Sequence, residues 1–420
     1  MLIHSAVQLL TLTADPQRGS HLGKLNILPD GAVLIEGDQI AEVGDSQELL
    51  RRFPHEQQYN AAGRVVMPGL VDAHTHLVWA GDRVAEFEMR LEGKSYLKIM
   101  TAGGGIQATV NATRAAKHEN LKSQTCQRAQ EIFHLGTTTA EAKTGYGLEL
   151  DSELKQMEVL LELDQESLLE IQPTFLAAHA IPAEYTGRAD EYVQLICSRM
   201  LPELKNWWAR KAPARPLPFV DVFCEKGTFS LEQTRHIFES ARTLGFPLKI
   251  HADEFENLGG TRLAVEMGAV SADHLVKTSP EEISLLAESQ TVAVALPCTP
   301  FGLGEHEYTP AREIIQKDGI LALASDLNPG TAWCGNMQFV IALACRYLRL
   351  TPSQAVAAAT INAAAAIGRQ AQLGSIHTGK QADLLVLSVP DYRHLAYRFG
   401  ANLVQVVFKR GKLYENTKPC

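Results

Sequence analysis

The chain has 420 residues, 45% of them hydrophobic, so it can bury a large core either as one α/β barrel with additions or as roughly two to three ordinary domains. Its formal net charge of −9 argues against a nucleic-acid or anionic-membrane partner, because such surfaces attract basic proteins. We therefore expect a small-molecule ligand.

The N-terminus lacks the basic segment and cleavage site of a signal peptide, and no uninterrupted apolar stretch approaches the length of a membrane span. The seven cysteines are odd in number and include no C-x-x-C pair, which makes a poor disulfide framework, so we expect them to be reduced. These features predict a cytoplasmic protein.

Short β-rich runs separated by turn residues occupy both ends of the chain. Ala32–Gly37 near the start and Leu403–Phe408 near the end are strand-like, and Lys409–Lys412 has the character of a hairpin turn. We therefore predict that residues 1–67 and 370–420 form one small β-sandwich-like domain built from both termini.

Between these ends, over residues 68–369, short apolar runs alternate with helical stretches. Eight candidate strands end near Thr75, Lys143, His179, Cys224, His251, His274, Leu296 and Asp326. Eight strand–helix units predict an α/β fold, a (β/α)8 barrel of the TIM type.

Helical periodicity predicts several of the connecting helices. They are Leu121–His134, Glu153–Leu163, Leu231–Leu244, Glu281–Glu288 and an Ala-rich helix over Thr351–Ile367. The stretch Asn206–Pro218, which contains Trp207, Trp208 and three prolines, predicts a surface loop.

Residues of the metal-ligand type fall at the carboxyl ends of the predicted strands, the face on which TIM barrels carry their active sites. They are His74, His76, His179, His251, His274 and Asp326. His74 and His76 stand two residues apart on one strand, so both imidazoles project to the same side and can bind one ion. His251 offers a third nitrogen and Asp326 an oxygen. Such a set leaves a position for water, whose pKa a metal ion lowers to about 7.

Each of these residues also has an ordinary structural explanation. We give an isolated H-x-H pair odds of roughly one in four of being a metal site. A lone His179 or His274 is more often a hydrogen-bonded core histidine, and an aspartate such as Asp326 is often only a helix cap. Their joint occurrence at strand ends of one barrel favours a metal-dependent hydrolase.

Further candidates lie in the loops at the same predicted face. Glu254, three residues after His251, is placed to move a proton to a departing nitrogen. Arg83 and Tyr146 follow predicted strand ends and could equally be ordinary loop residues. The run Ala102–Gly105 lacks the G-K-[ST] of a phosphate loop, so we predict a flexible loop near the barrel mouth. Cys224 and Cys298 are most simply small buried hydrophobes.

The segment Pro68-Gly69 leading into His74-x-His76, followed by His251, His274 and Ser325-Asp326, resembles the amidohydrolase superfamily. Within it the chain resembles the imidazolonepropionase family of histidine degradation over nearly its whole length. The matching segments are His74–Arg90, Ala102–Thr113, Glu141–Gly147, Phe175–Asp190, His251–Glu254 and Ser325–Thr331. The departures from the family pattern, at Ala73, Ala142, Thr144 and the tryptophan-containing loop, touch no proposed ligand.

The resemblance implies hydrolytic opening of 4-imidazolone-5-propanoate to N-formimidoyl-L-glutamate. It implies one Zn²⁺ or Fe³⁺ per chain, held by His74, His76, His251 and Asp326. It also implies a homodimer, and substrate contacts from Arg83, Tyr146, His179, Glu254, Asn328, Gly330 and Thr331. Glu254, His274 and Asp326 would then be the catalytic residues.

Three alternatives stay open from the sequence. Many relatives hold two metals bridged by a carbamylated lysine on the fourth strand, but Lys143 ends the second candidate strand and Phe219–Cys224 contains no lysine, which favours one metal. A cytosine- or guanine-type deaminase would share the metal ligands and Glu254, whereas the segments around Arg83 and Tyr146 favour the imidazolone substrate. A barrel that has lost catalysis and acts as a binding protein is disfavoured by the intact ligand set.

Overall fold

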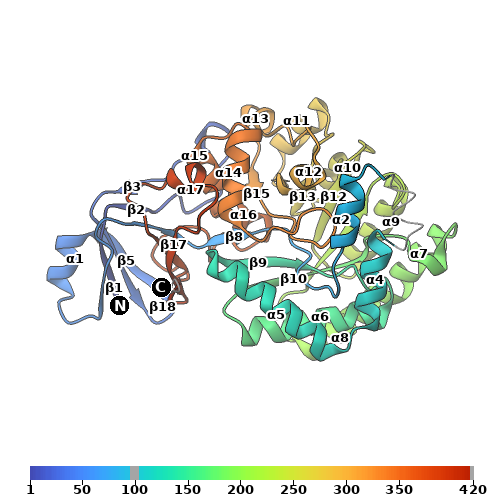
Figure 1. Cartoon of the computed structure of the whole chain (residues 1–420), viewed down its shortest axis with the longest axis horizontal. Helices are drawn as coiled ribbons and strands as arrows, with labels where there is room; N and C mark the ends of the chain where they lie inside the picture. The colour runs from blue at the N-terminus through green and yellow to red at the C-terminus, as the bar shows by residue number, and fades with distance from the viewer. Residues whose placement is uncertain (95–103, 417–420) are drawn as a thin grey trace.

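The computed structural model describes residues 1–94 and 104–416. A barrel of eight parallel strands lies at one end of the molecule and two smaller sheets lie at the other (Figure 1). The barrel strands pair in chain order and are β8 (Leu70–Asp72), β9 (Thr137–Lys143), β10 (Glu170–Ala178), β11 (Phe219–Cys224), β12 (Leu248–Ala252), β13 (Ser271–His274), β14 (Val292–Ala295) and β15 (Leu321–Leu323). The predicted barrel is confirmed, and every predicted strand end lies within a few residues of an actual one.

Backbone hydrogen bonds between the segments that follow β8 and β15 close the barrel. The amide of His76 donates to the carbonyl of Leu327 at 2.9 Å. The buried carboxylate of Asp72 accepts from the backbone amide of Ser325 at 3.0 Å and from its hydroxyl at 2.5 Å. This seam brings Asp326 beside the histidine pair that follows the first strand.

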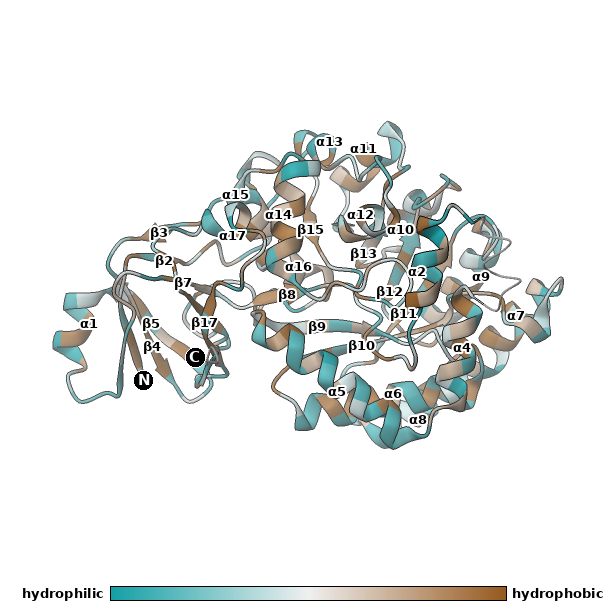
Figure 2. Ribbon diagram, viewed as in Figure 1, coloured by the Kyte–Doolittle hydropathy of each residue, from teal (hydrophilic) through white to brown (hydrophobic). Residues whose placement is uncertain are grey.

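Helices cover the outside of the barrel (Figure 1). They are α4 (Ile106–Ala115), α5 (His118–His134), α6 (Leu150–Glu166), α7 (Ala189–Leu195), α8 (Leu201–Lys211), α9 (Leu231–Thr243), α10 (Gly260–Met267), α11 (Pro280–Glu288), α12 (Cys298–Leu303), α13 (Ala311–Gln316), α14 (Met337–Tyr347), α15 (Pro352–Ala358) and α16 (Ile361–Ala366). Hydrophilic residues line the outer helices α5 and α8 (Figure 2). Capping boxes begin α9, α11 and α15; in α9, Ser230 and Gln233 satisfy each other's backbone amides.

Short helical segments complete the loops. They are α1 (Ser46–Arg52), α2 (Val84–Leu91), α17 (His394–Tyr397), the 3-10 turns η1 (Gly19–His21) and η2 (Ala183–Tyr185), and the π-helical turn η3 (Ile196–Met200). Among all the helices of the described residues, none is long and apolar enough to cross a membrane.

Strands from both termini share one of the two smaller sheets. Its order is β18-β17-β16-β7-β2-β3, and the second sheet has the order β5-β4-β1-β6. The strands are β1 (Leu2–Ala6), β2 (Gln8–Leu10), β3 (Ile27–Leu28), β4 (Gly31–Glu36), β5 (Gln39–Asp45), β6 (Gln58–Asn60), β7 (Val65–Pro68), β16 (Leu384–Leu387), β17 (Val404–Lys409) and β18 (Lys412–Glu415). The predicted hairpin turn joins β17 to β18, with Arg410 and Gly411 both in the left-handed region. The proposed division into two domains stays a prediction.

The predicted surface loop over residues 206–218 is wrong in its first half. Helix α8 continues to Lys211, and Trp207 and Trp208 are buried, at 8% and 2% exposure. The indole of Trp208 also donates to the carbonyl of Pro216 at 3.1 Å. Burial of two large aromatic side chains stabilises the helix, and only the proline-rich remainder forms the loop.

The single helix predicted over Thr351–Ile367 is also wrong, because α15 and α16 are separated at Ala359 and Thr360. The carbonyl of Ala359 accepts instead from the amide of Val71 in β8 at 3.0 Å. The Thr360 hydroxyl donates to the carbonyl of Val356 at 2.7 Å. The break therefore lets the chain fasten the start of the barrel, a long-range contact that local helix propensity does not report.

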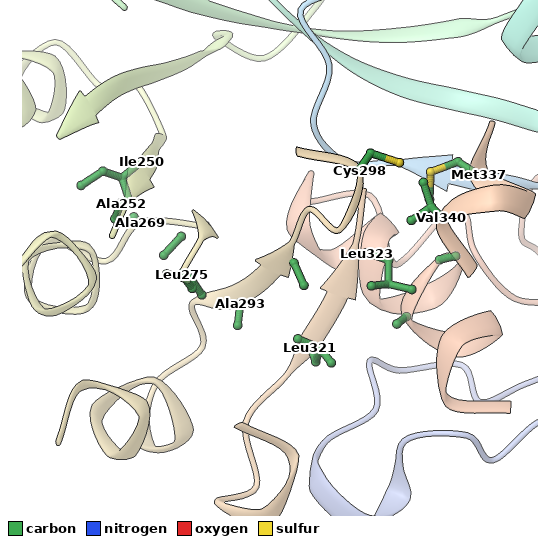
Figure 3. Packing of buried hydrophobic residues seen from close by; sticks show 14 of the residues in the cluster. Ile250, Ala252, Ala269, Leu275, Ala293, Cys298, Leu321, Leu323, Met337 and Val340 are labelled. Atoms are coloured by element: carbon green, nitrogen blue, oxygen red, sulfur yellow. The ribbon is translucent and has the colours of Figure 1, made fainter. Parts of the chain in front are cut away.

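The core lies between the strands and their covering helices. Figure 3 shows Leu323 of β15 near Met337 and Val340 of α14, with Leu321 further along the same strand. Cys298 belongs to the same cluster at 2% exposure, which confirms its prediction as a small buried hydrophobe.

Candidate active site

Five side chains of the metal-ligand type come together at one end of the barrel. His74 and His76 follow β8, His251 lies in β12, His274 ends β13 and Asp326 follows β15, and all five are buried. They make two overlapping groups, His74–His251–His274 and His74–His76–Asp326, in each of which the ligand atoms lie within 4.8 Å of one another. The topology thus gathers residues spread over some 250 positions of sequence.

The four proposed ligands converge closely. Oδ1 of Asp326 lies 3.4 Å from Nε2 of His74 and 3.5 Å from Nε2 of His76. Nε2 of His251 lies 3.3 Å from Nε2 of His76. Three imidazole nitrogens and one carboxylate oxygen form the donor set that zinc and iron prefer in catalytic sites.

Two buried aspartates select the tautomer of two of the three proposed histidine ligands, His74 and His251. Nδ1 of His74 lies 2.7 Å from Oδ2 of Asp273, and Nδ1 of His251 lies 3.1 Å from Oδ2 of Asp221. An ionised carboxylate only accepts, so each Nδ1 donates its proton and each Nε2 keeps a free lone pair. Burial, aided by the charge of Lys143, also lowers the pKa of His74 and keeps it neutral.

The unpartnered nitrogens of the cluster fit a metal ion. Nε2 of His74 and Nε2 of His274 are buried and have no hydrogen-bond partner within the described part of the chain. Leaving such an atom unsatisfied costs about 1–3 kcal/mol, a cost that a bound cation removes. The residues present therefore suit a metal centre.

Glu254 reaches the cluster because the chain turns sharply after β12. Asp253 adopts a positive φ of 55°, and its carboxylate accepts from the hydroxyls of Thr261 at 2.6 Å and Thr278 at 2.9 Å. The fixed turn places Glu254 and His274 in the lining of a pocket of 210 Å³.

Within that pocket, Oε2 of Glu254 lies 3.7 Å from Nδ1 of His274. Burial, together with the nearby charge of Asp326, raises the pKa of Glu254 well above its ordinary value. Burial likewise lowers the pKa of His274. The raised pKa makes the carboxylate of Glu254 a stronger proton acceptor than an exposed one, which suits a group that takes up a proton and passes it on.

Two neutral polar rings flank His76. The ring of His179, just past β10, stacks on it with centroids 4.7 Å apart, and the ring of Tyr146 lies at 5.9 Å. Nδ1 of His179 donates to the carbonyl of Gly145 at 3.0 Å. Burial lowers the pKa of His179 to about 3 and raises that of Tyr146, so both rings stay uncharged at neutral pH.

Asn328, Gly330 and Thr331 form one structural unit after β15. Oδ1 of Asn328 accepts from the backbone amides of Gly330 and Thr331, each at 2.8 Å, and its Nδ2 donates to the carbonyl of Asp326 at 2.7 Å. The Asn328 side chain therefore shapes the loop that follows the proposed aspartate ligand.

Arg83 lines a second pocket of 480 Å³ together with Gly330 and Thr331. Its guanidinium forms a two-point contact with Glu86, including Nε to Oε2 at 2.8 Å, and Glu86 also accepts from the amide of Gly105 at 2.8 Å. A Cβ atom on Gly330 would lie only 2.2 Å from Nη1 of Arg83, so a side chain at this position would displace the guanidinium. The structure thus places Arg83 beside the loop after β15 rather than within the histidine cluster. Part of the predicted glycine-rich loop lies outside the described residues.

Lys143 ends the second barrel strand, as the sequence predicts. Its ammonium lies 2.7 Å from Oε1 of Glu141 and 2.7 Å from Oδ2 of Asp221. Burial alone would lower the pKa of Lys143, but these carboxylates and Asp273 outweigh it and raise the pKa above its ordinary value. A lysine held in its charged form is unsuited to forming a carbamate bridge between two metals.

The sequence analysis did not identify the residues that orient the candidate site residues, notably Asp221, Asp273 and Glu86. A signal was present in the strands, where Glu141 and Lys143 stand at alternate positions of β9 and Asp273 directly precedes His274. Charged residues on one face of an otherwise buried strand require partners inside the barrel.

Known protein families and solved structures that are similar to this chain share its barrel fold. The model of the amidohydrolase family matches residues 65–414, and that of the bacterial imidazolonepropionase-like composite domain matches residues 31–55. Guanine deaminase of E. coli superposes with a TM-score of 0.74 at 16% identity, covering 99% of each chain. A zinc-bound adenosine deaminase of Xanthomonas campestris has a TM-score of 0.70 at 20% identity, covering 98% of this chain and 92% of its own.

Proteins related by sequence have much higher identity to this chain than these solved structures have. The imidazolonepropionase of Herpetosiphon aurantiacus is 48% identical over 98% of this chain and 96% of its own length. That of Chloroflexus aggregans is 48% identical over 98% of both chains. Identity at this level over the full length, with the amidohydrolase barrel, means that the chain belongs to the imidazolonepropionase family of amidohydrolases.

Proposed function

We propose that the protein hydrolyses the ring C–N bond of 4-imidazolone-5-propanoate to give N-formimidoyl-L-glutamate, a step of histidine degradation. The observation that carries this proposal is the near-half identity, over the full length, to proteins named imidazolonepropionase. The buried histidine–aspartate cluster supports it, because opening a cyclic amide requires activated water.

A metal ion held by His74, His76, His251 and Asp326 would supply Lewis-acid activation of water and of the ring carbonyl. Glu254 then accepts the proton of the attacking water and delivers it to the departing ring nitrogen. His274, whose Nδ1 lies 3.7 Å from Oε2 of Glu254, is a second candidate for moving this proton.

Substrate recognition follows from the flanking residues. Arg83 pairs with the propionate carboxylate through the guanidinium nitrogens that face Gly330 and Thr331. The neutral rings of Tyr146 and His179 donate to and accept from the heterocycle, and the loop of Asn328, Gly330 and Thr331 supplies further polar contacts.

One zinc or ferric ion per chain is part of the proposal, since the donor set suits either metal and the charged Lys143 leaves no bridge for a second. Elemental analysis of the purified protein should give about one metal per chain. Two tightly held ions per chain would contradict it. Activity lost on chelation and restored by zinc or iron would assign the metal.

A homodimer and a cytoplasmic location are also part of the proposal. Light scattering at several concentrations tests the first, and fractionation of cells that express the protein tests the second. A monomeric protein at micromolar concentration would contradict the proposed homodimer.

The decisive test follows the ultraviolet absorbance of imidazolonepropionate together with the appearance of N-formimidoyl-L-glutamate. We expect both to change in step and with equal amounts. Cytosine and guanine, assayed for ammonia release under the same conditions, separate this activity from that of a deaminase. Deamination at a comparable rate would overturn the proposal, and metal-loaded protein inactive on every substrate would favour a binding protein.

A further inference from the structure

A group of five charged side chains lies fully buried directly beneath the proposed metal ligands. It consists of Glu141, Lys143, Asp221, Lys249 and Asp273, each at 0–1% exposure, contributed by strands β9, β11, β12 and β13. Buried charges are costly unless they are paired, so a set of this size inside the barrel requires a purpose beyond stability.

Lys143 stands at the centre of this group. Its ammonium lies 2.7 Å from Glu141, 2.7 Å from Asp221 and 3.7 Å from Asp273. Lys249 is more peripheral, since its ammonium donates to the backbone carbonyls of Ala73 and Ala366 and makes only longer contacts with two carboxylates, 3.7 Å from Asp273 and 4.0 Å from Glu141. One ammonium therefore touches all three carboxylates.

The four proposed ligands, His74, His76, His251 and Asp326, are called the metal cage below. Each of the three carboxylates holds a different part of this cage. Asp221 accepts from Nδ1 of His251 and Asp273 accepts from Nδ1 of His74. Oε2 of Glu141 accepts, at 3.3 Å, from the amide of Thr75, which lies between the two histidines of the H-x-H pair. Moving Lys143 would thus disturb three attachment points of the cage at once.

We propose that Lys143 is a positioning residue, which holds Asp221, Asp273 and Glu141 in one arrangement and thereby sets the affinity of the site for its metal. Without the ammonium the three carboxylates repel one another, and the imidazoles that they orient move with them. This inference rests on the proposed metal ligands. It assigns Lys143 a task distinct from the bridging role of a carbamylated lysine.

The chain offers a matched control in Lys409. Its buried ammonium also joins two carboxylates, those of Glu170 at 2.9 Å and Asp383 at 2.6 Å. Lys409 lies in β17 and Glu170 begins β10, so this pair is at the opposite end of the barrel from the histidines. Replacing either lysine by methionine removes the same chemical group, but only Lys143→Met lies under the cage.

The experiment measures zinc affinity by competition with a chelator, alongside the melting temperature of the metal-free protein. We expect Lys143→Met to weaken zinc binding by about 10- to 100-fold, the usual scale for outer-shell partners. Lys409→Met should lower the melting temperature and leave zinc affinity unchanged. Wild-type affinity in Lys143→Met would overturn the inference, as would an equal loss in both variants.

A second variant covers the case in which Lys143→Met does not fold. Lys143→Met combined with Glu141→Gln removes one charge of each sign, so the group keeps its net charge while both histidine-bound aspartates remain. We expect zinc affinity to stay at least about 10-fold below wild type, because the aspartates still lack their common partner. Full recovery of affinity would reduce Lys143 to a charge-balancing role and overturn the inference. Failure of the wild-type protein to bind zinc or iron would instead count against the proposed metal centre.

Discussion

Glu254 and Asp326 are both acids of the candidate site, with side-chain exposures of 9% and 4%, yet their surroundings differ. The carboxylate of Asp326 accepts from the hydroxyl of Thr299 at 2.5 Å and lies 3.4 Å from the imidazole of His74. Oε2 of Glu254 lies 3.7 Å from Nδ1 of His274, and the Glu254 side chain lines the 210 Å³ pocket. The first environment suits a ligand, and the second suits a group that gains and loses a proton.

Glu254→Gln should therefore keep a normal metal content while turnover falls by about 100-fold or more, because the amide cannot cycle a proton. Metal content, melting temperature and turnover measured on one preparation check this. Near-normal turnover would remove Glu254 from the mechanism and leave His274 as the better candidate.

Arg83→Lys should bind substrate at least about tenfold more weakly, because a single ammonium cannot reproduce the paired hydrogen bonds of a guanidinium. The two-point contact between Arg83 and Glu86 fixes the orientation that the lysine would lose. The Michaelis constant for imidazolonepropionate is the readout. An unchanged constant would refute the pairing of Arg83 with the propionate tail.

At the scale of elements, the seam between β8 and β15 is where the barrel closes and where the H-x-H pair meets Asp326. Asp72 and Ser325 hold this seam, and the Ser325 hydroxyl also accepts from the amide of Leu327 at 3.1 Å. Because the seam carries proposed ligands on both sides, its packing connects barrel stability with metal binding.

Ser325→Ala should lower the free energy of unfolding by about 2 kcal/mol, since it removes a buried hydrogen bond to a carboxyl group and leaves the Leu327 amide without its partner. Denaturant titration of the metal-free protein measures this. Ser284→Ala, at a half-buried position of α11 where the hydroxyl makes a solvent-exposed hydrogen bond to Pro280, serves as the control with little expected change. Equal stability of the two variants would mean that the seam relaxes without cost.

At the scale of the whole molecule, the barrel and the sheet built from both termini meet at Glu170. Its carboxylate accepts from Lys409 at 2.9 Å, Arg369 at 2.7 Å and Gln381 at 2.8 Å. Burial alone would raise the pKa of Glu170, but Lys409 and Arg369 outweigh it and hold the pKa well below its ordinary value. The ionised form is therefore part of the folded state.

Because the folded pKa of Glu170 lies below its unfolded value of about 4.3, its contribution to stability is complete above that pH and is lost as the pH falls below it. Glu170→Gln should lower the free energy of unfolding at pH 7 by about 3 kcal/mol, because Arg369 loses its partner and Lys409 keeps only the ion pair with Asp383. Between about pH 5 and pH 3 the variant should lose less stability than the wild type. Parallel loss in the two proteins would show that Glu170 does not link folding to pH.

The eight strands and the histidines at their ends were readable from the sequence, because apolar periodicity and the H-x-H spacing are local properties. Sequence also indicated that Lys143 ends the second strand. The partners of these residues were decided only by the tertiary structure: His74 and Asp273 stand 199 positions apart, and no local pattern joins them. The break at Thr360 and the burial of Trp207 were decided in the same way, since each depends on contacts with distant segments that outweigh local propensity.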